Sequence, residues 1–400
     1  MSTKTQSHLA PNYKPLPVVI ATAEGEWVTD VGGRRYYDAL AGYSSLNFGH
    51  RHPALIQVVK DQMDRVTLVS RAFDFELLEP FASKLAQLCE MDMVLPMNTG
   101  AEAVETAIKA ARKWGYSAKG IPDDKSIIIV AEENFHGRTT TIGSFSSDQV
   151  ARADFGPFAP GFVAVPYGDT DALTAAVEQV GDRLAAVLLE PIQGEAGVNI
   201  PPVDYLQAAR RLTTEANALL IFDEIQSGLG RTGHTFAWQH FDVKPDLMTL
   251  GKALGGGVYP VSAAVGSAEV LGLMTAGTHG STFGGNPIAC ALGMAVCDIL
   301  QTGEYQERAR VLGEHFQSRL DGFVQQGLLL AKRGLGMWAG IDIDPARATG
   351  RAVCELLMDK GVLAKDTHGS TVRFAPPLST SKEDLDWMLD QLEAVLREIA

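Results

Sequence analysis

The sequence has few cysteines and no spacing that would pair them. None of the four, Cys89, Cys290, Cys297 and Cys354, belongs to a CxxC motif. The pattern therefore indicates neither a zinc site nor a disulfide framework. Because unpaired thiols persist in reducing compartments, a cytoplasmic location is the simplest interpretation.

Long apolar stretches are also missing. No segment approaches the roughly 18 uninterrupted apolar residues of a membrane-spanning helix. The N-terminal segment MSTKTQSHLAPNYKP is polar and lacks the apolar core of a signal peptide. We therefore expect a protein without a membrane partner.

Basic charge is in deficit. The chain has 48 acidic and 34 basic residues, which gives a formal net charge of −14 at pH 7. Nucleic acids and anionic membranes both require a basic face, so this balance argues against either as a partner. If the substrate is an anion, particular arginines must bind it locally.

What the chain does contain is a regular series of apolar runs between amphipathic helical patterns. Its 400 residues, 46% hydrophobic, are enough for two domains. Continuous rather than alternating apolarity is typical of strands covered on both faces, so we predict an α/β fold with a largely parallel sheet. The expected strands are SIIIVAEE (126–133), GFVAVPYG (161–168), LAAVLLEPI (184–192), ALLIFDEI (218–225) and DLMTLGKAL (246–254).

The C-terminal part has a different pattern, with helices expected over 288–301 and 304–326. Ser381 can cap a final helix, because apolar residues repeat after it at helical spacing. These apolar residues are Leu385, Met388, Leu389, Leu392 and Leu396.

These patterns divide the chain into three parts. We predict an N-terminal arm (1–50) that packs with a small C-terminal α+β domain (286–400). Between them we expect a large domain (51–285), which holds the parallel sheet.

The segment NTGAEAVETAIKAARKWGY, which starts at Asn98, predicts a helix with a special beginning. Thr99 and Glu102 have the T-x-x-E spacing of a capping box. Gly100 allows a ligand to approach the backbone amides, and the helix dipole favours an anion there. A capped surface helix without a ligand is an equally good interpretation of this segment alone.

A second glycine-rich motif, GLGRTG (228–233), matches the dinucleotide fingerprint G-x-G-x-x-G. A dinucleotide fold requires a helix to open at this point, but the segment HTFAWQHFDVKPD that follows has no helical stripe. We therefore reject a nucleotide-dependent dehydrogenase.

An acid and a lysine end two neighbouring apolar runs. Asp223 ends ALLIFD, and Lys252 follows DLMTLG; ligands of parallel α/β sheets bind at these carboxyl ends. An acid, a lysine and a glycine-opened helix suit pyridoxal phosphate, with the helix on its phosphate and Asp223 on its ring nitrogen. Lys252 would form a Schiff base, since burial lowers a lysine's pKa and frees the amine. We expect the glycines at 255–257 to make room for the cofactor and a neighbouring subunit.

Six motifs spread over nearly the whole chain carry a family resemblance. They are NTGAEAVETAIKAARKWGY, NFHGRT, EPIQGEAGV, IFDEIQSGLGRTG, GKALGGGVYPVSA and HGSTFGGNPIACA. Together they resemble the class III pyridoxal-phosphate aminotransferases. VTLVSRAF, PLPVV and AKDTHGSTVRFAPPL are closest to the members that use ornithine. The resemblance implies a fold-type I protein with a seven-stranded sheet, which forms a homodimer with active sites at the interface.

The resemblance also assigns residues to the cofactor. It makes Lys252 the Schiff-base residue and Asp223 the partner of the ring nitrogen, and it gives Thr282 to the phosphate of the neighbouring subunit. It gives no firm role to His136. The full cofactor-binding set that it implies is Lys252, Asp223, Gln226, Gly100, Ala101, Phe135 and Thr282.

The implied substrates are L-ornithine and 2-oxoglutarate, which differ in shape. By resemblance, Tyr43 and Arg138 hold the α-carboxylate of ornithine, so that its distal amine reaches the cofactor. Arg373 pairs with Glu195 while ornithine is bound and is released to hold the α-carboxylate of 2-oxoglutarate. An arginine fork suits a carboxylate, and an internal glutamate can neutralise that arginine in the meantime.

The implied reaction is transfer of the δ-amino group of ornithine to 2-oxoglutarate in a ping-pong cycle, which gives glutamate 5-semialdehyde and glutamate. Acetylornithine and 4-aminobutyrate aminotransferases are the nearest alternatives, and Tyr43 together with AKDTHGSTVRFAPPL argues against both. A non-catalytic scaffold is disfavoured because Lys252 and Asp223 are both present. One departure from the family is Asp74-Phe75 after SRAF. Its carboxylate either favours a substrate's cationic α-amino group or lies in solvent.

Overall fold

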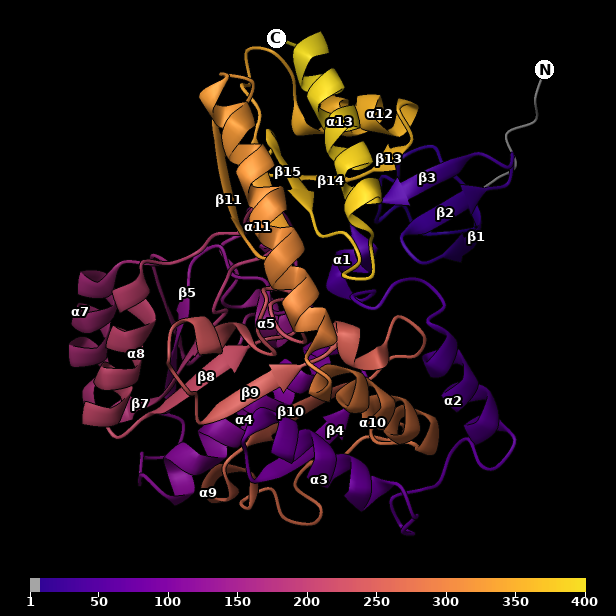
Figure 1. Cartoon of the computed structure of the whole chain (residues 1–400). Helices are drawn as coiled ribbons and strands as arrows, with labels where there is room; N and C mark the ends of the chain where they lie inside the picture. The colour runs from indigo at the N-terminus through magenta and orange to yellow at the C-terminus, as the bar shows by residue number, and fades with distance from the viewer. Residues whose placement is uncertain (1–7) are drawn as a thin grey trace.

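A seven-stranded sheet forms the centre of the computed structural model, which describes residues 8–400 (Figure 1). The strand order is β4-β10-β9-β8-β7-β5-β6. The pairs from β9 to β6 are parallel, whereas β10 runs antiparallel to both of its neighbours. The strands are β4 Met93–Met97, β5 Ile127–Ala131, β6 Phe162–Val165, β7 Leu184–Leu189, β8 Leu219–Asp223, β9 Leu247–Leu250 and β10 Ser262–Gly266. The predicted α/β fold with a mainly parallel sheet is confirmed.

Helices cover both faces of this sheet, which explains the continuous apolar runs. In β5, Ile128 and Val130 belong to the core beneath α4, whereas Ile129 and Ala131 belong to the core on the opposite face. Every residue of β7 is buried. The helices around the sheet are α2 Pro53–Met63, α3 Leu78–Cys89, α4 Gly100–Ser117, α5 Thr140–Gly143, α6 Gln149–Arg152, α7 Thr170–Val180, α8 Val203–Glu215, α9 Ala268–Leu271 and α10 Pro287–Gln301.

Two four-stranded sheets lie beyond the large one (Figure 1). One contains β1 Ile20–Glu24, β2 Trp27–Asp30, β3 Arg35–Asp38 and β13 Val362–Leu363. The other contains β11 Ala331–Leu335, β12 Trp338–Asp342, β14 Lys365–Thr367 and β15 Thr371–Phe374. The associated helices are α1 Ala41–Ser44, α11 Glu304–Gln325, α12 Gly350–Asp359 and α13 Lys382–Glu398. Strand β3 pairs in parallel with β13, so the N-terminal strands join C-terminal ones.

The structure confirms the predicted cap and the predicted apolar face of the last helix, α13. The hydroxyl of Ser381 accepts a hydrogen bond from the Asp384 N–H at 3.0 Å and so caps α13. The five apolar residues predicted to form its stripe are buried. The predicted division at residues 50 and 285 stays a prediction; the buried face of α10, which follows the second boundary, packs in the core of the large sheet.

The rejected dinucleotide motif has a structural role. No α-helix follows GLGRTG; after the loop comes only a short 3₁₀ turn, Ala237–His240. Arg231 within the motif is fully buried and donates to the carbonyls of Met337 and Pro376 and to the side-chain oxygen of Asn47. The arginine thus ties the loop after β8 to the segments around β12 and β15.

The glycines at 255–257 serve the chain's own packing. A Cβ at Gly256 would lie 2.5 Å from Leu55 Cδ1, and one at Gly257 would lie 2.2 Å from Leu46 Cδ2. Both glycines also have positive φ. They make room for leucines of the same chain, so the expectation that they admit the cofactor is wrong.

The four cysteines are buried and unpaired. Among residues 8–400, the longest helices are too short or too polar to cross a bilayer.

Candidate active site

Charged residues collect at one edge of the large sheet. Because β5, β7, β8 and β9 are parallel, their carboxyl ends meet at that edge. Asp223 ends β8, Glu190 directly follows β7, and Lys252 lies just beyond β9. All three line a cavity of about 200 Å³. Its other lining residues are Gly100, Ala101, Phe135, His136, Gly137, Ile192, Ile225 and Gln226.

The start of α4 forms one wall of this cavity. The predicted capping box is present: Thr99 Oγ1 accepts from the Glu102 N–H, and Glu102 Oε2 accepts from the Thr99 N–H at 2.8 Å. A Cβ at Gly100 would approach Ile225 Cδ1 to 3.0 Å, so glycine keeps the helix start close to the loop after β8. The first-turn amides and the helix dipole make this wall suitable for an anion such as a phosphate.

Lys252 stands opposite, in a strained backbone conformation. Its φ of 44° is positive, which is uncommon for a residue with a side chain. The side chain is partly accessible because it lines the cavity. Desolvation nevertheless lowers the pKa of Lys252, although the acids Glu195, Asp223 and Glu190 partly oppose the shift. An amine with a lowered pKa is the expected state of a nucleophilic lysine.

Asp223 is held by three donors. Its Oδ1 accepts from the Ile225 N–H at 3.1 Å and from the Thr249 hydroxyl at 3.0 Å. His136 Nδ1 lies 2.6 Å from Asp223 Oδ2. Burial disfavours protonation of His136, but the hydrogen bond to Asp223 and the charge of that acid outweigh it, so the pKa of His136 is raised.

Glu190 is a third buried acid at the same edge. It accepts hydrogen bonds from the Phe135 N–H at 3.0 Å and the Gly194 N–H at 3.3 Å. Burial raises the pKa of Glu190 to about 7. The carboxyl group therefore holds the loop after β5 against the loop after β7 without a full charge at neutral pH.

Two predicted cofactor residues, Phe135 and Gln226, also line the cavity. A Cβ at Gly194 would lie 2.1 Å from Gln226 Oε1, so glycine at that position is what lets the amide occupy its place. Thr282 is exposed and does not line the cavity. Its predicted role concerns a second subunit and stays a prediction.

The four predicted substrate residues share a second, larger pocket of about 870 Å³, which also includes residues 12–16 of the N-terminal arm. Arg373 Nη1 lies 2.6 Å from Glu195 Oε1, and the Arg373 guanidinium lies 5.4 Å from the centre of the Tyr43 ring. Arg138 is exposed, with its guanidinium 5.6 Å from the Phe135 ring centre. The family resemblance thus identified residues that the fold brings together.

The direction of the pKa shift of Glu195 fits an ion pair between Glu195 and Arg373. Burial opposes ionisation of Glu195, but the charge of Arg373 outweighs it and holds the pKa of Glu195 below its usual value. Burial raises the pKa of Tyr43, so its hydroxyl keeps its proton. Arg373 Nε is buried and has no hydrogen-bond partner among residues 8–400. A buried donor of this kind suits an incoming carboxylate.

The sequence interpretation missed two residues at this edge of the sheet, Glu190 and Thr249. Glu190 ends LAAVLLE as Asp223 ends ALLIFD, so strand-end position was the signal that could have identified it. Thr249 lies inside the apolar run DLMTL, where no pattern distinguishes it.

Asp74, the residue that departs from the family pattern, is exposed, and its Oδ1 accepts a hydrogen bond from the Phe75 N–H.

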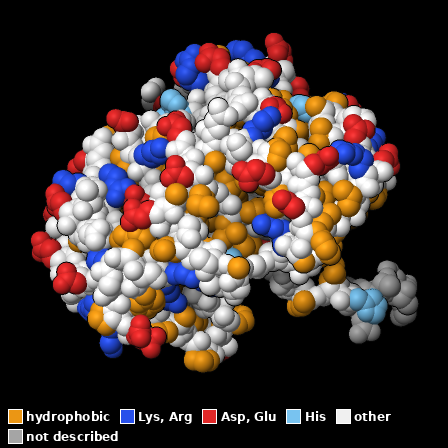
Figure 2. Space-filling model, turned by 90° about the horizontal axis from the view of Figure 1, so that it is seen from below, with side chains coloured by type: hydrophobic (Ala, Val, Ile, Leu, Met, Phe, Trp, Pro, Cys, Tyr) orange, Lys and Arg blue, Asp and Glu red, His pale blue; other side chains and the backbone are white. Residues whose placement is uncertain are grey.

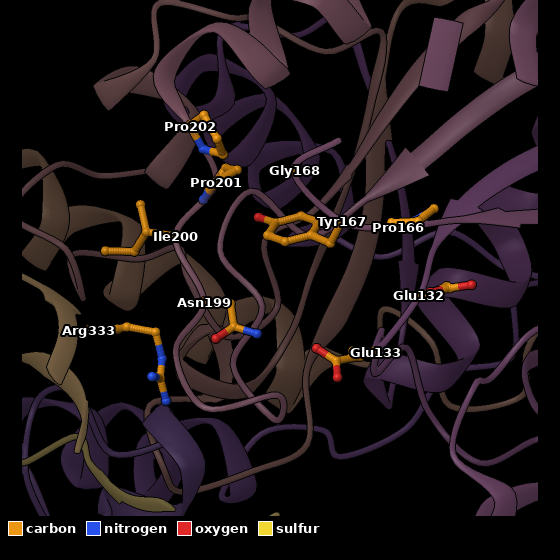
Figure 3. A pocket seen from close by; sticks show the side chains of 10 residues that line it. All are labelled: Glu132, Glu133, Pro166, Tyr167, Gly168, Asn199, Ile200, Pro201, Pro202 and Arg333. Atoms are coloured by element: carbon orange, nitrogen blue, oxygen red, sulfur yellow. The ribbon is translucent and has the colours of Figure 1, made fainter. Parts of the chain in front are cut away.

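Another pocket, of about 360 Å³, lies beside the loop after β7 (Figure 3). Figure 3 shows Arg333 and Glu133 on either side of Asn199, with Tyr167 above them. Both carboxylate oxygens of Asp342 already accept from Arg333, and the Tyr167 hydroxyl donates to the carbonyls of Glu190 and Pro191. The residues that line this pocket include no lysine, unlike those of the cavity at the sheet edge.

Comparison with known proteins adds a family match. The model of the family described as aminotransferase class-III matches residues 8–396. The chain is 49% identical to the ornithine aminotransferase of Halalkalibacterium halodurans, over 98% of this chain and 97% of that protein. It is 48% identical to the ornithine aminotransferase of Bacillus subtilis, over 98% and 96%.

Solved structures agree in fold. The crystal structure of ornithine aminotransferase from Toxoplasma gondii superposes with a TM-score of 0.95 at 40% identity, covering 98% of this chain and 93% of that one. The crystal structure of acetylornithine aminotransferase from Elizabethkingia anophelis gives a TM-score of 0.87 at 41% identity, covering 98% and 96%.

Removing the buried amine should stabilise the cofactor-free protein. Because the pKa of Lys252 is lowered in the folded state, the unfolded chain binds more protons between that pKa and 10.5, and stability rises with pH there. We expect Lys252→Met to raise the thermal midpoint at neutral pH, with an advantage that disappears as the pH approaches 10.5. Thermal unfolding across this range measures it.

The matched control is Lys60→Met, because Lys60 is exposed on α2. That variant should show no pH-dependent difference from the parent protein. A lower midpoint for Lys252→Met at neutral pH, or an advantage that grows with pH, would contradict the desolvation of Lys252.

Proposed function

The chain belongs to the class III aminotransferases, and we propose that it transfers the δ-amino group of L-ornithine to 2-oxoglutarate, forming glutamate 5-semialdehyde and L-glutamate. The observation that carries this proposal is the Arg373–Glu195 pair in the pocket that also contains Tyr43 and Arg138. Full-length identity of 48–49% to ornithine aminotransferases supports it. The reaction would link arginine and proline metabolism.

The cavity at the sheet edge fits pyridoxal phosphate, the cofactor of this class. Gly100 and Ala101 would hold the phosphate at the start of α4, and Asp223 would face the ring nitrogen. Phe135 would stack on the ring, and Gln226 would contact the side of its phenolic oxygen. When bound, the cofactor supplies an aldehyde that takes up an amine and a ring that accepts electrons.

Lys252 would both anchor the cofactor and move the proton. Desolvation lowers the pKa of Lys252, so its Nζ loses its proton more readily and the neutral amine forms more easily. The neutral Nζ can accept a proton from the δ-carbon of ornithine and return it in the second half of the exchange. Three donors hold the Asp223 carboxyl group in place and replace the water it has lost.

Two carboxylate sites would serve the two substrates. Tyr43 and Arg138 would bind the α-carboxylate of ornithine, while Glu195 neutralises Arg373. With 2-oxoglutarate or glutamate, Arg373 would release Glu195 and bind the substrate's α-carboxylate. The buried, unpartnered Nε of Arg373 supports this second role.

We further propose a homodimer with its active sites at the interface. Hydrophobic side chains gather in patches on the face that lies at the bottom of Figure 1, as Figure 2 shows. Large apolar residues are exposed in the segment after α2, including Phe73 at 71%, and Phe283 beside Thr282 is also exposed. A second subunit would cover such surface and bring Thr282 to its partner's phosphate.

The four buried, unpaired cysteines support a cytoplasmic location.

An amine-donor panel tests the proposed reaction. With 2-oxoglutarate as acceptor, we expect kcat/KM for L-ornithine to exceed those for acetylornithine and 4-aminobutyrate by about tenfold or more, because only ornithine presents both a free α-amino acid group and a distal amine. Lys252→Ala should have no detectable turnover with any donor. A preference for acetylornithine would reassign the substrate, and turnover by Lys252→Ala would overturn the role of that lysine.

Glu195 provides a test of the substrate switch. Glu195→Gln removes the internal counter-ion of Arg373, which is then free to bind the α-carboxylate of ornithine in the wrong orientation, with the α-amine instead of the δ-amine toward the cofactor. We expect kcat/KM for ornithine to fall by about tenfold or more while the value for glutamate is maintained. Single-turnover kinetics of each half-reaction separate the two effects.

The exposed Glu133→Gln is the matched control and should change neither half-reaction. Equal losses for ornithine and glutamate in Glu195→Gln would show that Glu195 only supports the pocket.

A further inference from the structure

The acid of the proposed substrate switch lies in a short loop whose backbone is held from outside the large sheet. Glu195 belongs to the turn between Gln193 and Asn199, which exchange backbone hydrogen bonds at 3.0 and 2.9 Å. The carbonyl oxygen of Glu195 accepts a hydrogen bond from the Thr367 hydroxyl at 2.8 Å. Among residues 8–400 this is the one hydrogen bond to the backbone of Glu195. The acid is therefore tied to a residue 172 positions further along the chain.

Thr367 ends β14, which pairs with the strand that carries Arg373. In this antiparallel pair Lys365 lies opposite Arg373, and Thr367 lies opposite Thr371. Residues two apart on a strand point to the same face of the sheet, and so do directly opposite residues. The side chains of Thr367 and Arg373 therefore project from one face, and the loop of Glu195 contacts both of them there.

The end of the loop is also held against the sheet. A Cβ at Gly340 on β12 would lie 2.2 Å from the carbonyl oxygen of Gly197, so the loop rests directly on this strand. The same carbonyl oxygen accepts from Arg333 Nε at 3.0 Å. These contacts fix the loop at Gly197, whereas the Thr367 hydroxyl holds the peptide of Glu195 itself.

The switch needs a fixed backbone and a movable side chain at Glu195. The side chain of Arg373 is only 4% exposed, whereas that of Glu195 is 26% exposed and lines the substrate pocket. The acid is therefore the partner that rotates away when a substrate carboxylate takes its place. A displacement of about 1 Å is enough to spoil the geometry of a site, so the peptide of Glu195 has to stay where it is.

We propose that Thr367 is a positioning residue that holds the peptide of Glu195 so that its carboxylate meets Arg373 whenever ornithine binds. The closed pair directs the α-carboxylate of ornithine away from Arg373 and the δ-amine toward the cofactor. Without the hydroxyl, the pair closes less completely, and Arg373 captures the α-carboxylate of part of the bound ornithine. The α-amine of those molecules is then transferred in place of the δ-amine. This inference rests on the proposed function.

L-Ornithine labelled with heavy nitrogen in its α-amine reports which amine is transferred. Transfer of the δ-amine to 2-oxoglutarate gives unlabelled glutamate and a labelled semialdehyde, whereas transfer of the α-amine gives labelled glutamate and a 2-oxo acid that keeps the δ-amine. Mass spectrometry of glutamate formed by the cofactor-loaded wild-type enzyme should show almost no label. In Thr367→Val, which keeps the side-chain shape and removes the donor, the labelled share should rise about fivefold, the value of one hydrogen bond. The half-reaction with ornithine should slow, and that with glutamate should be unchanged.

Three further variants make the test specific. Thr367→Ser retains a hydroxyl and should match the wild-type enzyme. In a protein that already carries Glu195→Gln, Thr367→Val should add no further label, because the carboxylate on which it acts is gone. The matched control is Thr174→Val on α7, which should leave the labelled share unchanged. The Thr174 hydroxyl also donates to a backbone carbonyl, that of Thr170 at 2.8 Å, but the residue lines neither the cavity nor the substrate pocket.

The outcomes separate the two proposals. An unchanged labelled share in Thr367→Val, equal slowing of the two half-reactions, or additional label in the double variant would overturn the positioning role, while δ-amine transfer by the wild-type enzyme upholds the reaction. Failure of the wild-type enzyme to transfer nitrogen from ornithine to 2-oxoglutarate would overturn the proposed function itself. If Thr367→Val does not fold, Thr367→Ala removes the same donor and carries the same expected results.

Discussion

Asp223 ends a strand whose residues are all buried, so protein groups must replace the water that its carboxyl group has lost. The Ile225 amide, the Thr249 hydroxyl and the His136 ring do so, from three separate segments. Lys252 meets the same constraint with the opposite sign, because desolvation lowers its pKa. The parallel sheet brings both groups to one edge, where they line the same cavity, the site that we propose for the cofactor.

Contacts of buried charged residues also connect the large sheet to the smaller sheets. Glu195 follows β7 in the loop that begins at Glu190, yet its partner Arg373 comes from β15. Arg231 holds the two regions together through the carbonyls of Met337 and Pro376. A buried arginine with several acceptors is costly to disrupt, so this contact keeps β15 and its Arg373 in a fixed relation to Asp223. The proposed substrate recognition by Arg373 thus depends on contacts far from the reacting atoms.

Much of this arrangement could be predicted from the sequence, for physical reasons that differ between residues. The strand ends at Asp223 and Lys252 were predictable because continuous apolarity indicates parallel strands and parallel strands align their carboxyl ends. The capping box at Thr99 was predictable because it is local. The Arg373–Glu195 pair came from family resemblance, since no local signal connects residues so distant in sequence.

Other features depend on tertiary contacts that the sequence does not reveal. His136 became interpretable only when the fold placed it against Asp223, and Thr249 is indistinguishable from its apolar neighbours in the chain. The glycines at 256 and 257 suggested space for a ligand, but they accommodate Leu55 and Leu46. A short flexible run indicates close approach without indicating what approaches.

We propose that pyridoxal phosphate binds covalently to Lys252 in the cavity that this lysine shares with Asp223. Borohydride reduction of the cofactor-loaded protein, followed by proteolysis and mass spectrometry, tests it most directly, because reduction fixes the cofactor to its lysine. We expect a pyridoxyl phosphate adduct on the peptide that contains Lys252 and on no other lysine. An adduct at a different lysine, or none on the Lys252 peptide of active enzyme, would contradict it.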